Sequence, residues 1–319
     1  MRDDIEFKTE DGTTLCGWLY RPKETPSDGV PIVVMAHGFS GVKGSLTKYA
    51  ETFCEAGLAV LLYDHRGYGD SGGDVRLEIV PHQQVADFRD AITFARTLKG
   101  IDPERVGIWG SSYAGGHCIN IAANDRRVKC VVAQIPIIAG HFMFKRMFQA
   151  DRQAELRKMF AADRENRLVG GEPARIPVFS TGDDICCLPP KVSKRFIEAS
   201  EDEDPNWRNE ATLRSLEHLG EYEPGALISH VSPTPLLMVV ALKDVLTPPE
   251  YALEAFERAL EPKRLVAVVG GHFSVYYQHL EKSRGEARDW FVKYLITEPA
   301  ALKQADVKIV QRASAQKAT

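Results

Sequence analysis

Two adjacent serines, Ser111 and Ser112, stand between an apolar run and a stretch of small residues in the segment RVGIWGSSYAGGH. A serine becomes a nucleophile on a sharp turn between a strand and a helix, where the residues two before and two after it must be small for the turn to close. For Ser111 those positions hold tryptophan and tyrosine, and for Ser112 they hold glycine and alanine. The spacing favours Ser112 as the nucleophile. The alternative is that both serines only cap the following helix.

A nucleophilic serine needs a base, and the base needs a group that orients it. His272 lies in VVGGHFSVY, just after an apolar run, and Asp244 lies in VVALKDVLTPP, just past the run before it. The chain order serine, aspartate, histidine is the order found in α/β-hydrolases. The sequence therefore predicts a catalytic triad of Ser112, Asp244 and His272.

Acyl transfer also needs two backbone N–H donors for the oxyanion of its tetrahedral intermediate. One is expected to be the amide of Tyr113, the residue after the nucleophile. The other is expected in the loop MAHGFSG, which follows the first buried run, and we assign it to the amide of Phe39. The side chain of Phe39 would then line the site that binds the acyl group.

The elements that must position these residues alternate along the chain as short apolar runs and amphipathic segments. The segments, for example QQVADFRDAITFARTL, have helical spacing. The N-terminal stretches on either side of EDG alternate as an antiparallel hairpin does. The unbroken runs are typical of strands buried on both faces of a parallel sheet; they are residues 31–37, 58–65, 105–110, 128–135, 235–242 and 264–269. This pattern predicts an α/β fold with a mainly parallel central sheet and helices on both faces.

The alternation of runs and segments fails between about Pro136 and Ser232, where one short strand-like piece, RIPVFST, interrupts charged and Met/Phe-rich stretches. Because this interval falls between two good strands, we expect a mostly helical lid inserted over the ligand-binding edge of the sheet. The predicted organisation is a hydrolase core over 1–135 and 233–296, a lid over 136–232 and a C-terminal tail over 297–319.

In the lid, HFMFKRMF places apolar side chains one helical turn apart. They can pack on the core, or they can face the nucleophile and contact an acyl chain, and both can hold at once. Met143, Phe144 and Met147 are the candidate substrate contacts. The acidic run EASEDEDPNWRNE, residues 198–210, is expected to be a solvated turn, because clustered carboxylates without ligand spacing repel one another.

Composition narrows the classes of partner. The 319 residues are 44% hydrophobic and 26% charged, as in a globular protein with a substantial core, and the formal net charge of −4 argues against a nucleic-acid partner. No apolar run is long enough for a membrane span, and the acidic N-terminus does not resemble an export signal, so a cytoplasmic location is expected. The six cysteines lack the spacing of a zinc site, and the pair Cys186-Cys187 is expected to pack as apolar residues. No metal or cofactor is predicted.

The motifs HGFSG, DHRGYGDSGG, GSSYAGG, LKDVLTP and GGHF together resemble the α/β-hydrolase superfamily over roughly residues 4–295. Within it the chain is similar to dienelactone-hydrolase-like and esterase-like proteins, including a branch of fungal polyketide transferases and thiohydrolases. A true dienelactone hydrolase would carry cysteine where this chain has Ser112, and an epoxide hydrolase would carry aspartate. The resemblance implies a serine enzyme that needs no cofactor.

The function expected from these residues is hydrolysis of a carboxylic ester, lactone or thioester of a small-molecule acyl substrate through an acyl-enzyme on Ser112. The alternative is an acyltransferase that uses the same triad and passes a polyketide or other acyl group to an alcohol or amine. A more remote alternative is a ligand-binding protein without catalysis on the same fold. Amide cleavage is not expected. A homodimer is compatible with the sequence, although no segment indicates one.

Overall fold

The structure is a computed structural model that describes residues 2–24, 26–189, 197–198 and 204–298. Its centre is an eight-stranded sheet with the order β1-β2-β4-β3-β5-β6-β9-β10. The first two strands form the predicted hairpin and pair antiparallel with each other, and β2 pairs antiparallel with β4, whereas the other neighbours pair parallel. The strands are β1 (Arg2–Lys8), β2 (Thr14–Tyr20), β3 (Val30–Ala36), β4 (Ala59–Tyr63), β5 (Ile101–Ser111), β6 (Val128–Gln134), β9 (Leu236–Ala241) and β10 (Lys263–Val268). The predicted mainly parallel sheet is confirmed.

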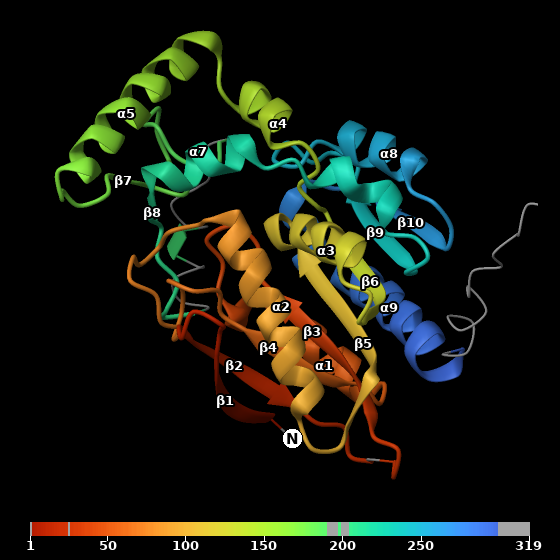
Figure 1. Ribbon diagram of the computed structural model, residues 1–319. Coiled ribbons are helices and arrows are strands. Elements are labelled where there is room, and N and C mark those ends of the chain that lie inside the picture. The colour runs from red at the N-terminus through yellow and green to blue at the C-terminus, as the bar shows by residue number, and fades with distance from the viewer. Residues whose placement is uncertain (1, 25, 190–196, 199–203, 299–319) are drawn as a thin grey trace, which may run out of the picture.

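Helices cover both faces of the sheet (Figure 1). Alternate residues of β3 explain why: Ile32 and Val34 belong to one apolar cluster and Val33 and Met35 to another, because successive side chains of a strand point to opposite faces. The first cluster also contains residues of α2 (Pro81–Thr97), α3 (Tyr113–Asn124) and α8 (Pro249–Arg258). The second contains residues of α1 (Thr47–Glu55) and α9 (Leu280–Phe291). The core is therefore two apolar layers, one on each side of the sheet.

The regular structure described between β6 and β9 is mainly helical, as predicted, and Figure 1 shows α4, α5 and α7 beyond one end of the sheet. A third apolar cluster joins this segment to the core, since it combines Leu156 and Leu216 with Val42 and Tyr113. The elements of the segment are α4 (Gly140–Met147), α5 (Ala150–Leu168), β7 (Arg175–Ile176), β8 (Ala211–Thr212), α7 (Leu213–Glu221) and the 3₁₀ helix η2 (Pro224–His230). The strand-like piece RIPVFST contributes only the two residues of β7.

Short helical turns lie beside the ends of the strands. They are the 3₁₀ helices η1 (Lys43–Leu46) and η3 (His272–Tyr276), and a π-helical turn, η4 (Val292–Thr297), continues α9. Most of the predicted C-terminal tail, from residue 299, lies outside the described residues.

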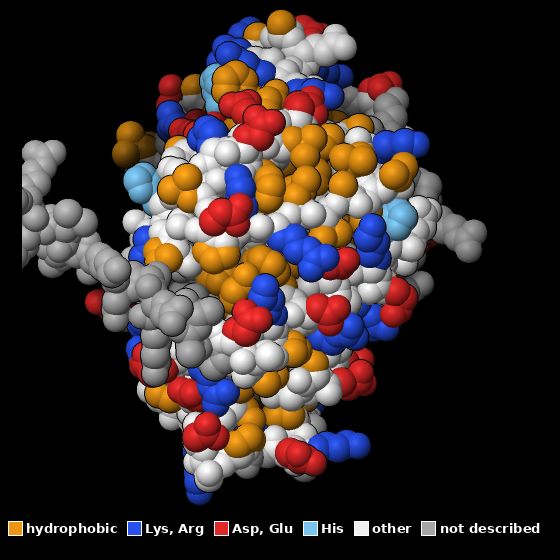
Figure 2. All heavy atoms as spheres, turned by 90° about the vertical axis from the view of Figure 1, so that its right-hand side faces the viewer, with side chains coloured by type: hydrophobic (Ala, Val, Ile, Leu, Met, Phe, Trp, Pro, Cys, Tyr) orange, Lys and Arg blue, Asp and Glu red, His pale blue; other side chains and the backbone are white. Residues whose placement is uncertain are grey.

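Figure 2 shows the side of the molecule that is on the right in Figure 1, where α8, β10 and α9 lie. Apolar side chains reach the surface there in groups that Lys, Arg, Asp and Glu side chains interrupt. Among the described residues, no helix combines the length and the apolar character needed to cross a membrane.

Candidate active site

Ser112 occupies the turn between β5 and α3 with a strained backbone. Its φ is 57° and its ψ is −114°, a conformation that non-glycine residues rarely adopt. The small neighbours are required by space: a Cβ on Gly110 would lie 2.2 Å from the carbonyl oxygen of Ala114, and one on Gly115 would lie 3.0 Å from that of Gln134. The turn is held in place by the Ser112 N–H, which donates to the Gln134 carbonyl at 2.8 Å. The predicted frame, with Ser112 at the sharp turn, is what the structure shows.

The other two predicted residues come from the loops after β9 and β10, and the structure brings both to Ser112. The Ser112 Oγ lies 3.0 Å from His272 Nε2, and His272 Nδ1 lies 2.7 Å from Asp244 Oδ2. His272 and Asp244 are buried. Because β9 and β10 are parallel neighbours, their carboxyl ends, and hence these two loops, lie at the same edge of the sheet.

Asp244 is held by donors from its own loop. The N–H groups of Leu246 and Thr247 donate to its Oδ1 at 2.8 and 2.9 Å, and the Thr247 hydroxyl lies 2.8 Å from its Oδ2. Burial by itself raises the pKa of this carboxyl, but the neighbouring His272 and these hydrogen bonds outweigh burial, so the pKa of Asp244 lies below its ordinary value. The side chain is therefore a carboxylate at neutral pH, able to accept a hydrogen bond from the Nδ1–H of His272.

The loop after β3 lies directly against the nucleophile. A Cβ on Gly38 would lie 3.0 Å from the Ser112 Cβ and 3.5 Å from its Oγ, so only glycine fits there without displacing Ser112. The next residue is Phe39, whose ring packs edge-on against Tyr113 with 5.6 Å between the ring centres. Tyr113 begins α3, where backbone N–H groups have no acceptor within the helix. The two residues predicted to supply oxyanion donors thus flank Ser112.

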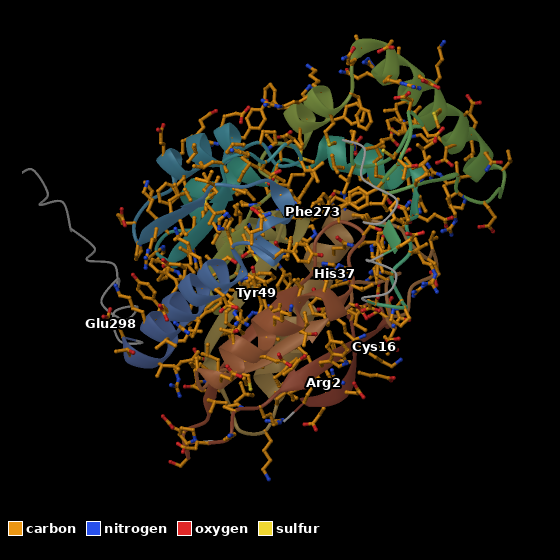
Figure 3. All side chains as sticks on the ribbon, turned by 180° about the vertical axis from the view of Figure 1, so that it is seen from behind. Arg2, Cys16, His37, Tyr49, Phe273 and Glu298 are labelled. Atoms are coloured by element: carbon orange, nitrogen blue, oxygen red, sulfur yellow. The ribbon has the colours of Figure 1, made fainter. Side chains whose placement is uncertain are left out.

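A pocket of about 410 Å³ opens from Ser112 and His272. Phe39 lines it, as predicted, and Figure 3 labels Tyr49 and Phe273, which line it from α1 and from η3. Much of the lining is apolar, whereas Lys48, Glu51 and Asp204 place charged groups at it. A small molecule with an apolar body suits this volume.

Met143, Phe144 and Met147 do not line this pocket. They belong to the third apolar cluster, in which Met143 is buried and the other two are partly buried. The residues that the lid segment does contribute were not singled out by the sequence; they are Phe179, Leu188, Asp204 and Trp207.

Two of these four fall in the acidic run that we expected to be a solvated turn. Trp207 is buried and Asp204 lines the pocket, so the expectation is wrong for this part of the run, while residues 199–203 lie outside the described residues. The Trp itself was the available signal, because a large apolar ring seldom lies in a fully solvated turn.

The loop after β4 supports the loop after β3 through a buried ion pair. Lys43 Nζ lies 2.5 Å from Asp64 Oδ2 and 2.5 Å from Asp70 Oδ2, and the Lys43 N–H donates to Asp64 Oδ1 at 2.7 Å. Arg66 pairs with Asp87 on α2. These side chains hold the loops of the site in place.

The adjacent cysteines pack in the interior. Cys186 and Cys187 are buried free thiols, and burial raises the pKa of both. Within the described part of the chain, no three His, Cys, Asp or Glu side chains are grouped so that they could hold a metal ion.

The sheet order, the strained serine between β5 and α3, and the acid and histidine after the next two strands define an enzyme of the α/β-hydrolase class. Sequence comparison identifies the family within this class. The chain belongs to the X-Pro dipeptidyl-peptidase (S15) family, whose family model matches residues 11–274.

Its relatives include enzymes with other names. The thiohydrolase aneE of Aspergillus aculeatus is 34% identical over 270 residues, which are 82% of this chain and 83% of the relative. The polyketide transferase grgF of a Penicillium species is 29% identical over 299 residues, 92% of this chain and 97% of the relative. The crystal structure of α/β hydrolase GrgF from Penicillium sp. sh18 superimposes with a TM-score of 0.79 at 28% identity, covering 92% of this chain and 99% of that one. The resemblance to thiohydrolases and polyketide transferases is confirmed.

Proposed function

We propose that this protein is a serine hydrolase that cleaves a carboxylic ester, lactone or thioester through an acyl-enzyme on Ser112. The observation that carries the proposal is the unbroken hydrogen-bonded chain from Ser112 through His272 to Asp244 at the end of a pocket. As the Ser112 Oγ attacks the substrate carbonyl, His272 Nε2 takes its proton. Asp244 accepts a hydrogen bond from the Nδ1–H of His272 and stays ionised, which fixes the tautomer of the base and stabilises its charged form.

The tetrahedral intermediate would be stabilised by the amides of Phe39 and Tyr113. Losing one such donor typically raises the barrier by about 3 kcal/mol. His272 then gives its proton to the leaving alcohol or thiol, and a water that loses a proton to the same nitrogen releases the acid.

The substrate class follows from the pocket and from the relatives. A largely apolar pocket of about 410 Å³ suits the acyl part of a small molecule. A relative named a thiohydrolase at 34% identity favours a thioester over an oxygen ester. The family description names a peptidase, so an X-Pro anilide belongs among the test substrates.

Acyl transfer is the second candidate, and a second pocket supports it. This pocket, of about 370 Å³, adjoins the first along His272 and Phe273 and is lined mainly by apolar residues, among them Val245 and Leu246. An acceptor alcohol held there would lie beside the base that must take its proton. A relative named a polyketide transferase is in keeping with this alternative.

The test compares wild type, Ser112→Ala and Ser111→Ala with nitrophenyl esters of two to twelve carbons, the matching acyl-pantetheine thioesters and an X-Pro nitroanilide. We expect turnover of esters or thioesters by wild type and a loss of at least ~1,000-fold in kcat/KM for Ser112→Ala. Mass spectrometry should find a serine-directed phosphonate on residue 112 in wild type and in Ser111→Ala. Added 1-hexanol distinguishes transfer from hydrolysis, because transfer yields the hexyl ester.

Each other outcome points to a different conclusion. Labelling of Ser111, or full activity of Ser112→Ala, would refute Ser112 as the nucleophile. Turnover of the anilide alone would make the protein a peptidase. A wild type that neither turns over nor is labelled would leave the ligand-binding alternative.

A further inference from the structure

The other serine of the pair, Ser111, is buried and hydrogen-bonded at the end of β5. It is the last residue of β5 and pairs with Gln134, the last residue of β6. The Gln134 side-chain amide donates to Ser111 Oγ at 3.2 Å, and Ser111 Oγ lies 2.5 Å from the Tyr276 hydroxyl, with either oxygen able to donate. Ser111 is fully buried. The residue beside the nucleophile is thus fixed to another part of the chain.

That other part is the turn that carries the histidine. The 3₁₀ helix η3 begins at His272 and ends at Tyr276, so the hydroxyl of its last residue is bonded to the neighbour of Ser112. A hydrogen bond at one end of a five-residue helix restrains the residue at its other end. The contact between Ser111 and Tyr276 therefore limits how far His272 can move from Ser112.

A second tie holds the same turn from α1. The Tyr49 hydroxyl lies 2.8 Å from the carbonyl oxygen of Val275 and 3.0 Å from the side-chain oxygen of Gln134. The same hydroxyl lies 2.7 Å from Ser283 Oγ. Burial raises the pKa of Tyr49 to about 12 and also raises that of Tyr276, so both phenols keep their protons at neutral pH. The side chain of Gln134 bonds both Ser111 and Tyr49, and its backbone carbonyl accepts a hydrogen bond from the Ser112 N–H.

The network lies in apolar surroundings. Tyr49 packs its ring against Trp109 with 4.8 Å between the ring centres, and both belong to the second apolar cluster. A buried hydroxyl that loses its partner is left without a hydrogen bond, which costs free energy. A buried hydroxyl pair therefore favours the one arrangement in which both groups are bonded.

We propose that Ser111 and Tyr276 are positioning residues whose hydroxyl pair holds His272 at the distance from Ser112 that proton transfer requires. This inference rests on the proposed function. Neither hydroxyl takes part in the chemistry: each acts through the turn that joins it to His272 or through the strand end that joins it to Ser112. The ring of Tyr276 lines the pocket, so a change that removes only the oxygen keeps the pocket wall.

The experiment is a double-mutant cycle with Ser111→Ala, Tyr276→Phe and the double variant. Each single change removes one oxygen atom. We expect kcat for a short nitrophenyl ester to fall about ten-fold in either single variant with KM within two-fold of wild type, because a base displaced by a fraction of an ångström transfers protons less well. The double variant should be no more than two-fold slower than the slower single variant, since both changes break one contact.

Two features keep a loss of folding from imitating this result. Rates are expressed per active site, counted by stoichiometric phosphonate titration, so unfolded molecules drop out. Tyr294→Phe removes the same atom from a tyrosine in η4, where the ring packs on Trp290, and should leave kcat unchanged.

The outcomes separate this inference from the proposed function. A wild type that is not labelled and does not turn over any ester refutes the function. An active wild type with kcat per site unchanged in both single variants, or with losses that multiply in the double variant, overturns the positioning role. If one single variant does not yield folded protein, the other decides the question alone.

Discussion

His117, on the helix that follows the nucleophile, is buried without a charge partner and should make the folded protein sensitive to acid. Its Nδ1 lies 2.9 Å from the Tyr222 hydroxyl and its Nε2 lies 3.0 Å from Gln84 Oε1. The ring is fully buried and contacts Tyr113 and a second buried histidine, His65. Burial, with the nearby His37, lowers the pKa of His117 to about 3.

The sign and size of the effect follow from the two states. In the unfolded chain the imidazole takes up a proton near its ordinary pKa of about 6.5, while in the folded chain it stays neutral down to about pH 3. Between these values the unfolded state binds more protons, so the free energy of unfolding falls as the pH falls, by about 1.4 kcal/mol per pH unit. From pH 7 to pH 5 this single group should remove about 2 kcal/mol of stability.

Urea unfolding at pH 7 and pH 5 measures the effect in wild type, His117→Asn and His82→Asn. His117→Asn is expected to be less stable at pH 7, where it loses hydrogen bonds, but to lose about 2 kcal/mol less than wild type between the two pH values. His82→Asn, at an exposed position of α2, is the control for replacing a histidine. Equal losses in wild type and His117→Asn would refute the reasoning, because then the imidazole is already charged in the fold or accepts a proton without cost.

Three further predictions concern the site. Asp244→Asn should lower kcat about 10³- to 10⁴-fold in ester hydrolysis. Its oxygen can keep the backbone donors of Leu246 and Thr247, so its NH₂ group faces His272 Nδ1 and donates to it, which imposes the wrong tautomer on the base. A loss below ten-fold would contradict the assigned acid. Gly38→Ala places a Cβ 3.0 Å from the Ser112 Cβ, and we expect the folded variant to hydrolyse a nitrophenyl ester with kcat reduced by about 10- to 100-fold. A wild-type kcat would mean that the loop after β3 can move away without displacing Ser112. Lys43→Met leaves the Asp64 carboxylate buried without its cation, so urea unfolding should show a free energy of unfolding lower by about 3 kcal/mol or more. An unchanged unfolding midpoint would show that the backbone donors to Asp64 are enough to stabilise its buried charge.

The parts of the fold that the sequence predicted well are those in which a local pattern reports burial. The run 31–37 became β3 within one residue, and this strand is buried throughout because both of its faces are covered; a strand of this kind has few polar positions. The run 264–269 became β10, also within one residue, although this strand lies at the edge of the sheet and has exposed positions. The frame at Ser112 was equally readable, since steric limits two residues away select glycine or alanine whatever the rest of the chain does.

The lid shows where such patterns stop being informative. Helical spacing in HFMFKRMF predicted an apolar face, and α4 has one, but spacing does not say which neighbour covers that face. Met143 packs within the third apolar cluster. Trp207 and Leu188 reach the pocket from stretches without periodicity, so only their tertiary path places them there. Long-range packing of an irregular segment is not encoded in any window of a few residues.

The pair of serines combines both cases in two adjacent residues. Along a strand, successive side chains point in opposite directions, so a nucleophile that leaves the end of β5 must have a neighbour that points the other way, into the sheet layer. A polar neighbour there needs partners, and Gln134 and Tyr276 supply them. The geometry that turns Ser112 toward the pocket is thus the same geometry that buries Ser111. The hydrogen bonds that satisfy Ser111 come from the strand that holds the Ser112 amide and from the turn that carries His272.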